Sequence, residues 1–184
     1  LGLLCPDLVF ANGYRLLGSP GAPYITEVLD SLNIPYVGSK FALMSTFMSK
    51  VETKKLLVKH NIPTPDYTVA ELHQSPELLD AVRLPAIAKI AEGAESEGVC
   101  KVENLHELRD AVSALHRQYG QSVLVETWCR AREYTVAVLG NKLDRSIMPI
   151  EILVPEGFDF LSNKVKADCF ARTILEVSAS KKKE

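Results

Sequence analysis

Apolar and polar positions along this chain repeat with the period of a strand in some segments and of a helix in others. Short apolar runs bounded by turn-forming residues predict strands at "DLVFAN" (7–12), "IPYVGS" (34–39), "YTVA" (67–70), "PAIAKIA" (85–91), "VCKV" (99–102) and "SVLVETW" (122–128). The long run "EYTVAVLGNKLDRSIMPIEILV" predicts two further strands, with a hairpin turn at Gly140-Asn141.

Helical spacing of apolar residues marks other segments. It predicts one helix from the stripe Ile25, Val28, Leu29 and Leu32, two helices between residues 40 and 61, and one near 75–83. A further helix begins at Asn104, which resembles a capping box together with Glu107, and its apolar stripe is Leu105, Leu108, Val112 and Leu115.

The order of these elements indicates a mix of α/β and α+β structure. Strand, loop, helix and strand follow one another at the start of the chain, which is an α/β signature, and the middle combines antiparallel strands with helices on one side. The segment "NIPTPDY" (61–67) stops a helix, because proline disfavours helical geometry in the residue before it. A domain border is expected there.

Composition narrows the classes of function. The 184 residues are 47% hydrophobic, enough for a real core, and 21 basic residues nearly balance 23 acidic ones. The near-zero net charge therefore does not favour binding to nucleic acid or to an anionic membrane. No apolar window reaches the ~18 residues of a membrane span. Four widely spaced cysteines argue against a zinc site or a disulfide framework, so we expect a reducing, cytoplasmic setting.

A lysine inside an apolar strand is the first candidate for chemistry. Lys89 in "LPAIAKIAEGAESEGVCKV" must reach water or meet an anion, because burying an unpaired ammonium is costly. If the following loop folds over a phosphate, Gly93, Ser96 and Gly98 offer backbone and hydroxyl donors. On these residues alone, the commoner arrangement is a solvent-facing lysine on an edge strand beside a flexible hairpin.

Two glutamates at strand ends are the second candidate. In "VLVETWCRAREYTVAVLG", Glu126 closes one apolar strand and Glu133 opens the next, and such carboxylates can accept from an adenine amino group or from ribose hydroxyls. The alternative is that both glutamates only cap strand ends. Trp128, the sole tryptophan, is more typical of a core than of a base-stacking platform.

Several motifs become informative when they are taken in order: "IPYVGS", a lysine about a dozen residues on, "NIPTPDY", "LPAIAKIAEGAESEGVCKV", "VLVETW" and "REYTVAVLGN". This order, over residues 7–168, resembles the D-alanine–D-alanine ligase family of the ATP-grasp superfamily. Where the family typically reads V-x-V-K-P, E-G-S-S-x-G and V-L-x-E-x-(F/W), this chain keeps the lysine, the last glycine and V-L-x-E-x-W. The resemblance implies the remnant of an α/β first domain at 1–39, an ATP-grasp central subdomain at 40–139, and a partial catalytic C-terminal subdomain at 140–184.

The resemblance also assigns roles to the candidate residues. It implies an ATP site formed by the phosphate lysines Lys50 and Lys89, the loop residues Ser96 and Gly98, the adenine-receiving residues Glu126, Thr127, Trp128 and Cys129, and the ribose-binding Glu133. Lys164 in "FLSNKV" matches the lysine of the family's Y-x-x-K-Y segment, over the phosphates and the acyl-phosphate site, and is the catalytic candidate.

The family's reaction suits such a set of residues. ATP phosphorylates the carboxylate of one D-alanine, and the amine of a second attacks the acyl phosphate, while lysines and Mg²⁺ neutralise the charge on the transferred group. The implied partner is a small molecule, D-alanine or another amino acid. The family is commonly dimeric through its first domain, which leaves a homodimer open.

The sequence departs from the family pattern at four places. The family's H-G-x-x-G-E-D-G is "NGYRLLGSPGAP" in this chain, its S-S pair is Glu95-Ser96, its M-D-K is Met48-Ser49-Lys50, and no E-x-N strand for magnesium occurs. We therefore expect a chain that is incomplete at both ends and lacks the metal ligands. Three alternatives stay open: a ligase for a different amino acid pair, a catalytically silent nucleotide-binding or interaction fragment, and a product without a stable fold.

Overall fold

A computed structural model of the chain describes residues 6–11, 13–16, 23–74, 76–93, 97–141, 144–160, 165 and 174–177. The chain divides into two compact units, Leu1–Thr64 and Pro65–Glu184. This division falls inside "NIPTPDY", where the sequence predicts a border. The finer boundaries at 39/40 and 139/140 remain predictions.

The first unit begins with a small α/β arrangement. Strands β1 (Val9–Phe10) and β2 (Tyr36–Val37) pair in parallel, and helix α1 (Ile25–Ser31) lies between them in sequence. Parallel strands need such a crossover, so the predicted strand-helix-strand order is confirmed. Of the expected helical stripe, Leu29 is fully buried, whereas Leu32 lies at the C-cap and is 44% exposed.

Two helices follow, as the sequence predicts. Helix α2 (Phe41–Met48) ends at Ser49, and helix α3 (Lys50–Lys59) begins directly after it. The Ser49 hydroxyl accepts a hydrogen bond from the amide of Glu52 at 3.3 Å. Ser49 therefore caps α3 and marks the break between the two helices.

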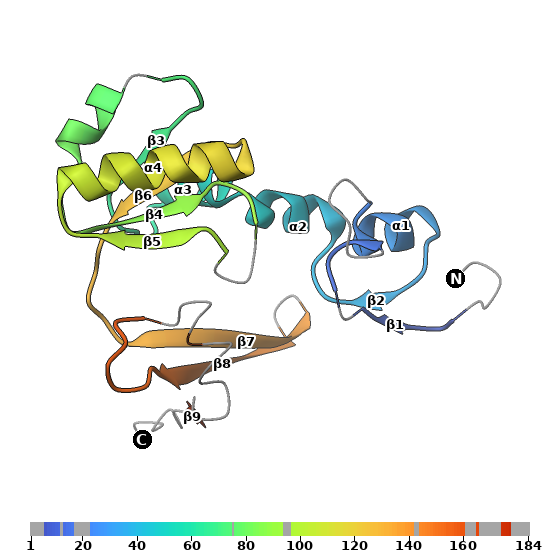
Figure 1. Ribbon diagram of the computed structural model, residues 1–184. Helices are drawn as coiled ribbons and strands as arrows, with labels where there is room; N and C mark the ends of the chain where they lie inside the picture. The colour runs from blue at the N-terminus through green and yellow to red at the C-terminus, as the bar shows by residue number, and fades with distance from the viewer. Residues whose placement is uncertain are drawn as a thin grey trace. The chain divides into compact units, whose positions relative to one another are not determined.

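The second unit contains an antiparallel four-stranded sheet covered on one face by a long helix. The strand order is β3 (Tyr67–Ala70), β6 (Val123–Thr127), β4 (Ala86–Ile90) and β5 (Val99–Val102), and helix α4 (Leu105–Tyr119) lies across it (Figure 1). The core between them consists of Ala70, Leu79, Ala86, Ala88, Ile90, Val102, Leu108, Val112, Leu115, Val123 and Val125. The expected helix near 75–83 is a six-residue 3-10 helix, η2 (Pro76–Ala81).

The N-terminus of α4 follows the predicted capping chemistry. The side chain of Asn104 accepts from the amide of Glu107 at 2.9 Å, and the Glu107 carboxylate accepts from the amide of Glu103 at 2.8 Å. The helix ends at Gly120, whose φ of 62° is a left-handed conformation that glycine adopts readily.

A second, three-stranded sheet consists of β7 (Glu133–Asn141), β8 (Asp144–Leu153) and β9 (Ile174–Val177). Gly140 pairs with Arg145 and Asn141 with Asp144, so both residues belong to the end of β7. The two strands are confirmed, but the prediction that Gly140-Asn141 forms the turn between them is wrong. Gly140 has φ +99°, and a Cβ at this position would collide with the backbone of Asp144. In the part of the chain that the structure describes, no helix is long and apolar enough to cross a membrane.

The contact between α4 and the sheet predicts a large loss of stability for Leu108→Ala. Leu108 is fully buried, so truncation should lower the free energy of unfolding by about 2–5 kcal/mol, measured by urea denaturation. Gln118→Ala, on the exposed side of the same helix, is the control and should stay within about 0.5 kcal/mol of the parent chain. Equal losses for the two variants would contradict this account of the core.

Candidate functional site

The four-stranded sheet has a second face, opposite α4, which we call the site face. Ala86, Ala88 and Ile90 of β4 are buried in the core, so Ile87 and Lys89 point to the site face. Residues paired across antiparallel strands share a face. The register therefore gives the site face one row of Glu126, Ile87 and Lys101, and a neighbouring row of Leu124, Lys89 and Val99.

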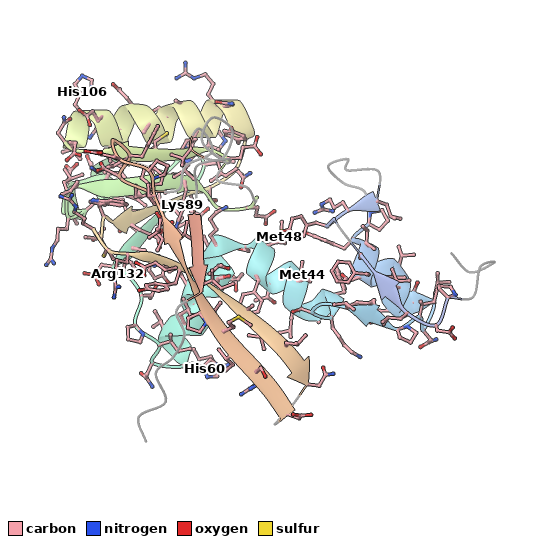
Figure 2. All side chains as sticks on the ribbon, turned by 90° about the horizontal axis from the view of Figure 1, so that it is seen from below. Met44, Met48, His60, Lys89, His106 and Arg132 are labelled. Atoms are coloured by element: carbon pink, nitrogen blue, oxygen red, sulfur yellow. The ribbon has the colours of Figure 1, made fainter. Side chains whose placement is uncertain are left out.

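Lys89 forms an ion pair with Glu126 on this face. The two residues are diagonal neighbours on β4 and β6, since Glu126 pairs with Ile87 and Lys89 pairs with Leu124. Their side chains are only 24% and 11% exposed. Strand β4 lies between β5 and β6, so the expectation of a solvent-facing lysine on an edge strand is wrong. Figure 2 labels Lys89 on the side of the sheet away from α4.

Two glycines bring the loop after β4 close to its own strand. The amide of Ile90 donates to the carbonyl of Gly98 at 3.2 Å. Gly98 has φ +59°, and a Cβ there would lie 2.8 Å from Cγ2 of Ile90; a Cβ on Gly93 would lie 3.1 Å from Cδ1 of the same residue. Only glycine allows both approaches, which suits a loop whose backbone meets a ligand.

The end of β6 is fixed on both sides by backbone hydrogen bonds. The amide of Thr127 donates to the carbonyl of Asp66, and the amide of Trp128 donates to the carbonyl of Pro85, each at 2.9 Å. Cys129 follows, with its thiol 3.8 Å from the carbonyl of Thr127. We call Glu126–Cys129 the hinge segment. Its backbone is held next to the Lys89–Glu126 pair.

A cluster around Lys101 adds residues that the sequence did not suggest. The Lys101 ammonium donates to Asp159 at 2.6 Å, lies 3.0 Å from Glu103, and lies 5.2 Å from the ring centre of Trp128. Phe160 packs edge-on against the Trp128 ring, with 5.6 Å between centroids. Trp128 is half-buried and outside the core under α4, so its predicted place in a core is wrong.

The charges in this cluster stabilise one another. Hydrogen bonding to Asp159, and then to Glu103, raises the pKa of Lys101, and the hydrogen bond from Lys101 lowers the pKa of Asp159. The only sequence signal for this cluster is the alternation in "VCKV", which places Lys101 on one strand face without saying which residues it meets. Asp159 and Phe160 lie in the turn after β8, which is far from Lys101 in the sequence.

The other predicted phosphate and ribose residues belong to other elements or lie outside the described ranges. Lys50 begins α3 in the first unit, and Glu133 begins β7, opposite Ile152. Ser96 and Lys164, as well as Glu95, lie outside the described residues. Within the described ranges, no three His, Cys, Asp or Glu side chains come close enough to hold a metal ion.

Comparison with known proteins gives a consistent set of relatives. The family described as "D-ala D-ala ligase C-terminus" matches residues 56–184. The D-alanine–D-alanine ligase of Alcanivorax borkumensis is 36% identical over 144 residues, which is 78% of this chain and 44% of the relative. That of Streptococcus thermophilus is 32% identical over 180 residues, 92% of this chain and 51% of the relative. The chain therefore spans about half the length of these curated relatives.

Solved structures of related enzymes are also similar to this chain. The D-alanine–D-alanine ligase from Coxiella burnetii has a TM-score of 0.66 at 30% identity, over 79% of this chain and 42% of that one. The D-alanyl-alanine synthetase A from Vibrio cholerae has a TM-score of 0.71 at 24% identity, over 96% of this chain and 54% of that one, which shows likeness of fold.

The close approach at Gly98 predicts a specific mutational effect. Gly98→Ala combines a strained left-handed φ with a collision against Ile90, whereas Gly120→Ala, at φ +62° with open space around it, has the strain alone. We expect Gly120→Ala to cost about 1–2 kcal/mol of stability and Gly98→Ala about 1–3 kcal/mol more, measured by urea denaturation. Equal costs would show that Ile90 does not limit the loop.

Proposed function

Because the chain belongs to the D-alanine–D-alanine ligase family, we propose that it is the ATP-binding part of an enzyme that joins a carboxylate to an amine through an acyl phosphate. The resemblance read from the sequence is confirmed at the level of the family, and so is the mixed α/β and α+β fold class. The observation that best supports nucleotide binding is the Lys89–Glu126 pair on the site face, beside the hinge segment.

The groups on the site face suit the parts of an adenine nucleotide. The Glu126 carboxylate can accept from an adenine amino group. An ammonium carries three donors, so the contact of Lys89 with Glu126 is compatible with donation to a phosphate oxygen. The glycines at both ends of the loop after β4 allow its backbone to approach the phosphates.

We assign the remaining roles as the family resemblance implies them. Lys50 and Ser96 are assigned to the phosphates, Glu133 to the ribose, and Lys164 to the acyl-phosphate site, each from its place in the order of motifs. Mg²⁺ would supply charge neutralisation on the phosphates. The described residues do not form a site for it, so we assign no metal ligand and no metal-dependent step to this chain.

The chemistry requires positioning more than side-chain reactivity. As the phosphoryl group moves from ATP to a carboxylate, negative charge spreads over its oxygens, and lysine ammonium groups held in place stabilise that charge. A sheet whose opposite face packs against α4 is a suitable support for Lys89. The acyl phosphate is then attacked by the amine of the second substrate.

A ligase for a different amino acid pair is the second candidate. In the segment that replaces the family's H-G-x-x-G-E-D-G, the Arg15 guanidinium donates to the Tyr24 hydroxyl at 2.9 Å and lies 4.0 Å from the ring centre of Tyr24. This segment lacks the family's histidine and its acidic pair, and that loss favours a different first substrate.

Lys89→Met should weaken binding of Mg-ATP by about 10- to 100-fold in isothermal calorimetry, since it removes a charge-assisted hydrogen bond to phosphate. Lys55→Met is the matched control, because Lys55 is an exposed lysine paired with Glu52 on α3. Unchanged affinity in Lys89→Met, in a chain that still melts cooperatively, would remove Lys89 from the site. No binding by the parent chain would reject the nucleotide-binding role.

The identity of the substrate predicts a separate result. In a phosphate-release assay with the protein at its natural length, we expect D-alanine to stimulate ATP cleavage more than other amino acids do. D-alanine is the substrate that the names of its relatives state. Stimulation by another amino acid alone would reject the dipeptide product and favour the second candidate. Nucleotide binding without stimulation by any amino acid would favour the catalytically silent fragment.

A further inference from the structure

Lys101 connects three segments that are distant in sequence. It projects from β5 onto the site face, in the same row as Ile87 and Glu126. Its ammonium meets Asp159, in the turn after β8, and the ring of Trp128, at the exit of β6. The side chain of Lys101 is 23% exposed and that of Asp159 is 52% exposed, so the lysine is the more enclosed partner of the pair.

The surroundings of Lys101 argue against direct phosphate binding. Two carboxylates, Glu103 and Asp159, lie within 3.0 Å and 2.6 Å of its ammonium and take up its charge. Lys89, by contrast, pairs with one carboxylate, that of Glu126, among the residues that the structure describes. A phosphate would meet the carboxylates of Glu103 and Asp159 as well as the ammonium, and like charges repel. Lys101 is therefore better suited to hold protein groups in place.

The group that Lys101 holds is part of the hinge segment. In the described part of the chain, hydrogen bonds from the amides of Thr127 and Trp128 fix the backbone up to Trp128. The ring of Trp128 itself contacts two side chains, the ammonium of Lys101 and the ring of Phe160. Because Phe160 is adjacent to Asp159, one ion pair orders both the tryptophan and the aromatic ring that packs against it.

We propose that Lys101 is a positioning residue for nucleotide binding: through Asp159 and Trp128 it fixes the direction of the hinge segment and fastens the turn at 155–160 to the site face. The role rests on the proposed function of the hinge segment as the adenine contact. Lys101 acts through its neighbours and does not touch the nucleotide.

The first test uses the intrinsic fluorescence of Trp128, which is the only tryptophan of the chain. Without nucleotide, Lys101→Met and Asp159→Asn should each shift its emission to longer wavelength and increase quenching by acrylamide. Lys101→Arg, which keeps the charge, should restore the parent spectrum. Arg109→Met is the matched control, because it breaks an equally short ion pair, 2.6 Å to Asp80, in the same unit.

The second test measures Mg-ATP affinity by calorimetry in the same variants. We expect about a 3- to 10-fold loss in Lys101→Met and Asp159→Asn, recovery in Lys101→Arg, and no change in Arg109→Met. Asp159 is 52% exposed, so Asp159→Asn decides the matter if Lys101→Met fails to fold. Parent-like spectra and affinity in Asp159→Asn would overturn the proposal, as would a spectral change without loss of affinity.

The two tests separate this proposal from the proposed function. If the parent chain binds no Mg-ATP, nucleotide binding is rejected, while the fluorescence still reports whether Lys101 holds Trp128. If the parent chain binds and the Lys101 and Asp159 variants bind equally well, only the positioning role is rejected.

Discussion

A lysine and a glutamate on one face of a four-stranded sheet constrain the rest of the second unit. Removing one of two enclosed charges leaves the other without compensation, at a cost of about 3–5 kcal/mol when the pair is fully buried. The side chains of Lys89 and Glu126 are 24% and 11% exposed, so their contact offsets part of the cost of enclosing both charges. Their pairing therefore depends on β4 and β6 holding one register.

The opposite face of the same strands supplies that register. A slip of one residue would turn Ala86, Ala88 and Ile90 away from α4 and bring Ile87 and Lys89 into the core. Burial of a charged lysine under α4 is far more costly than any alternative packing can offset. The apolar contact with α4 and the ion pair thus enforce the same alignment, and the geometry of the site follows from the core.

Local patterns in the sequence account for much of this fold but not for the encounters between segments. The capping residue Asn104 and the apolar stripe through Leu108 lie close together in the sequence, so helix α4 could be predicted from local pattern alone. The partners of Lys89 and Lys101 depend on strand register and on a turn after β8, which no local period encodes. The sequence favours a core position for Trp128 because a tryptophan is more typical of a core than of a base-stacking platform. It does not show that Lys101 and Phe160 contact the ring.

The site face carries two lysines, Lys89 and Lys101, whose surroundings differ. This difference fits two separate roles, nucleotide contact for Lys89 and positioning for Lys101. Lys101 is engaged by two carboxylates and an aromatic ring, all supplied by the protein. Lys89 is paired with Glu126, a residue that itself suits an adenine amino group. Under the proposed function, the Lys89 ammonium would donate to a phosphate and the Glu126 carboxylate would accept from the adenine amino group. Binding would exchange contacts within the pair without disturbing Lys101, so the hinge segment keeps its direction while the charges beside it change partners.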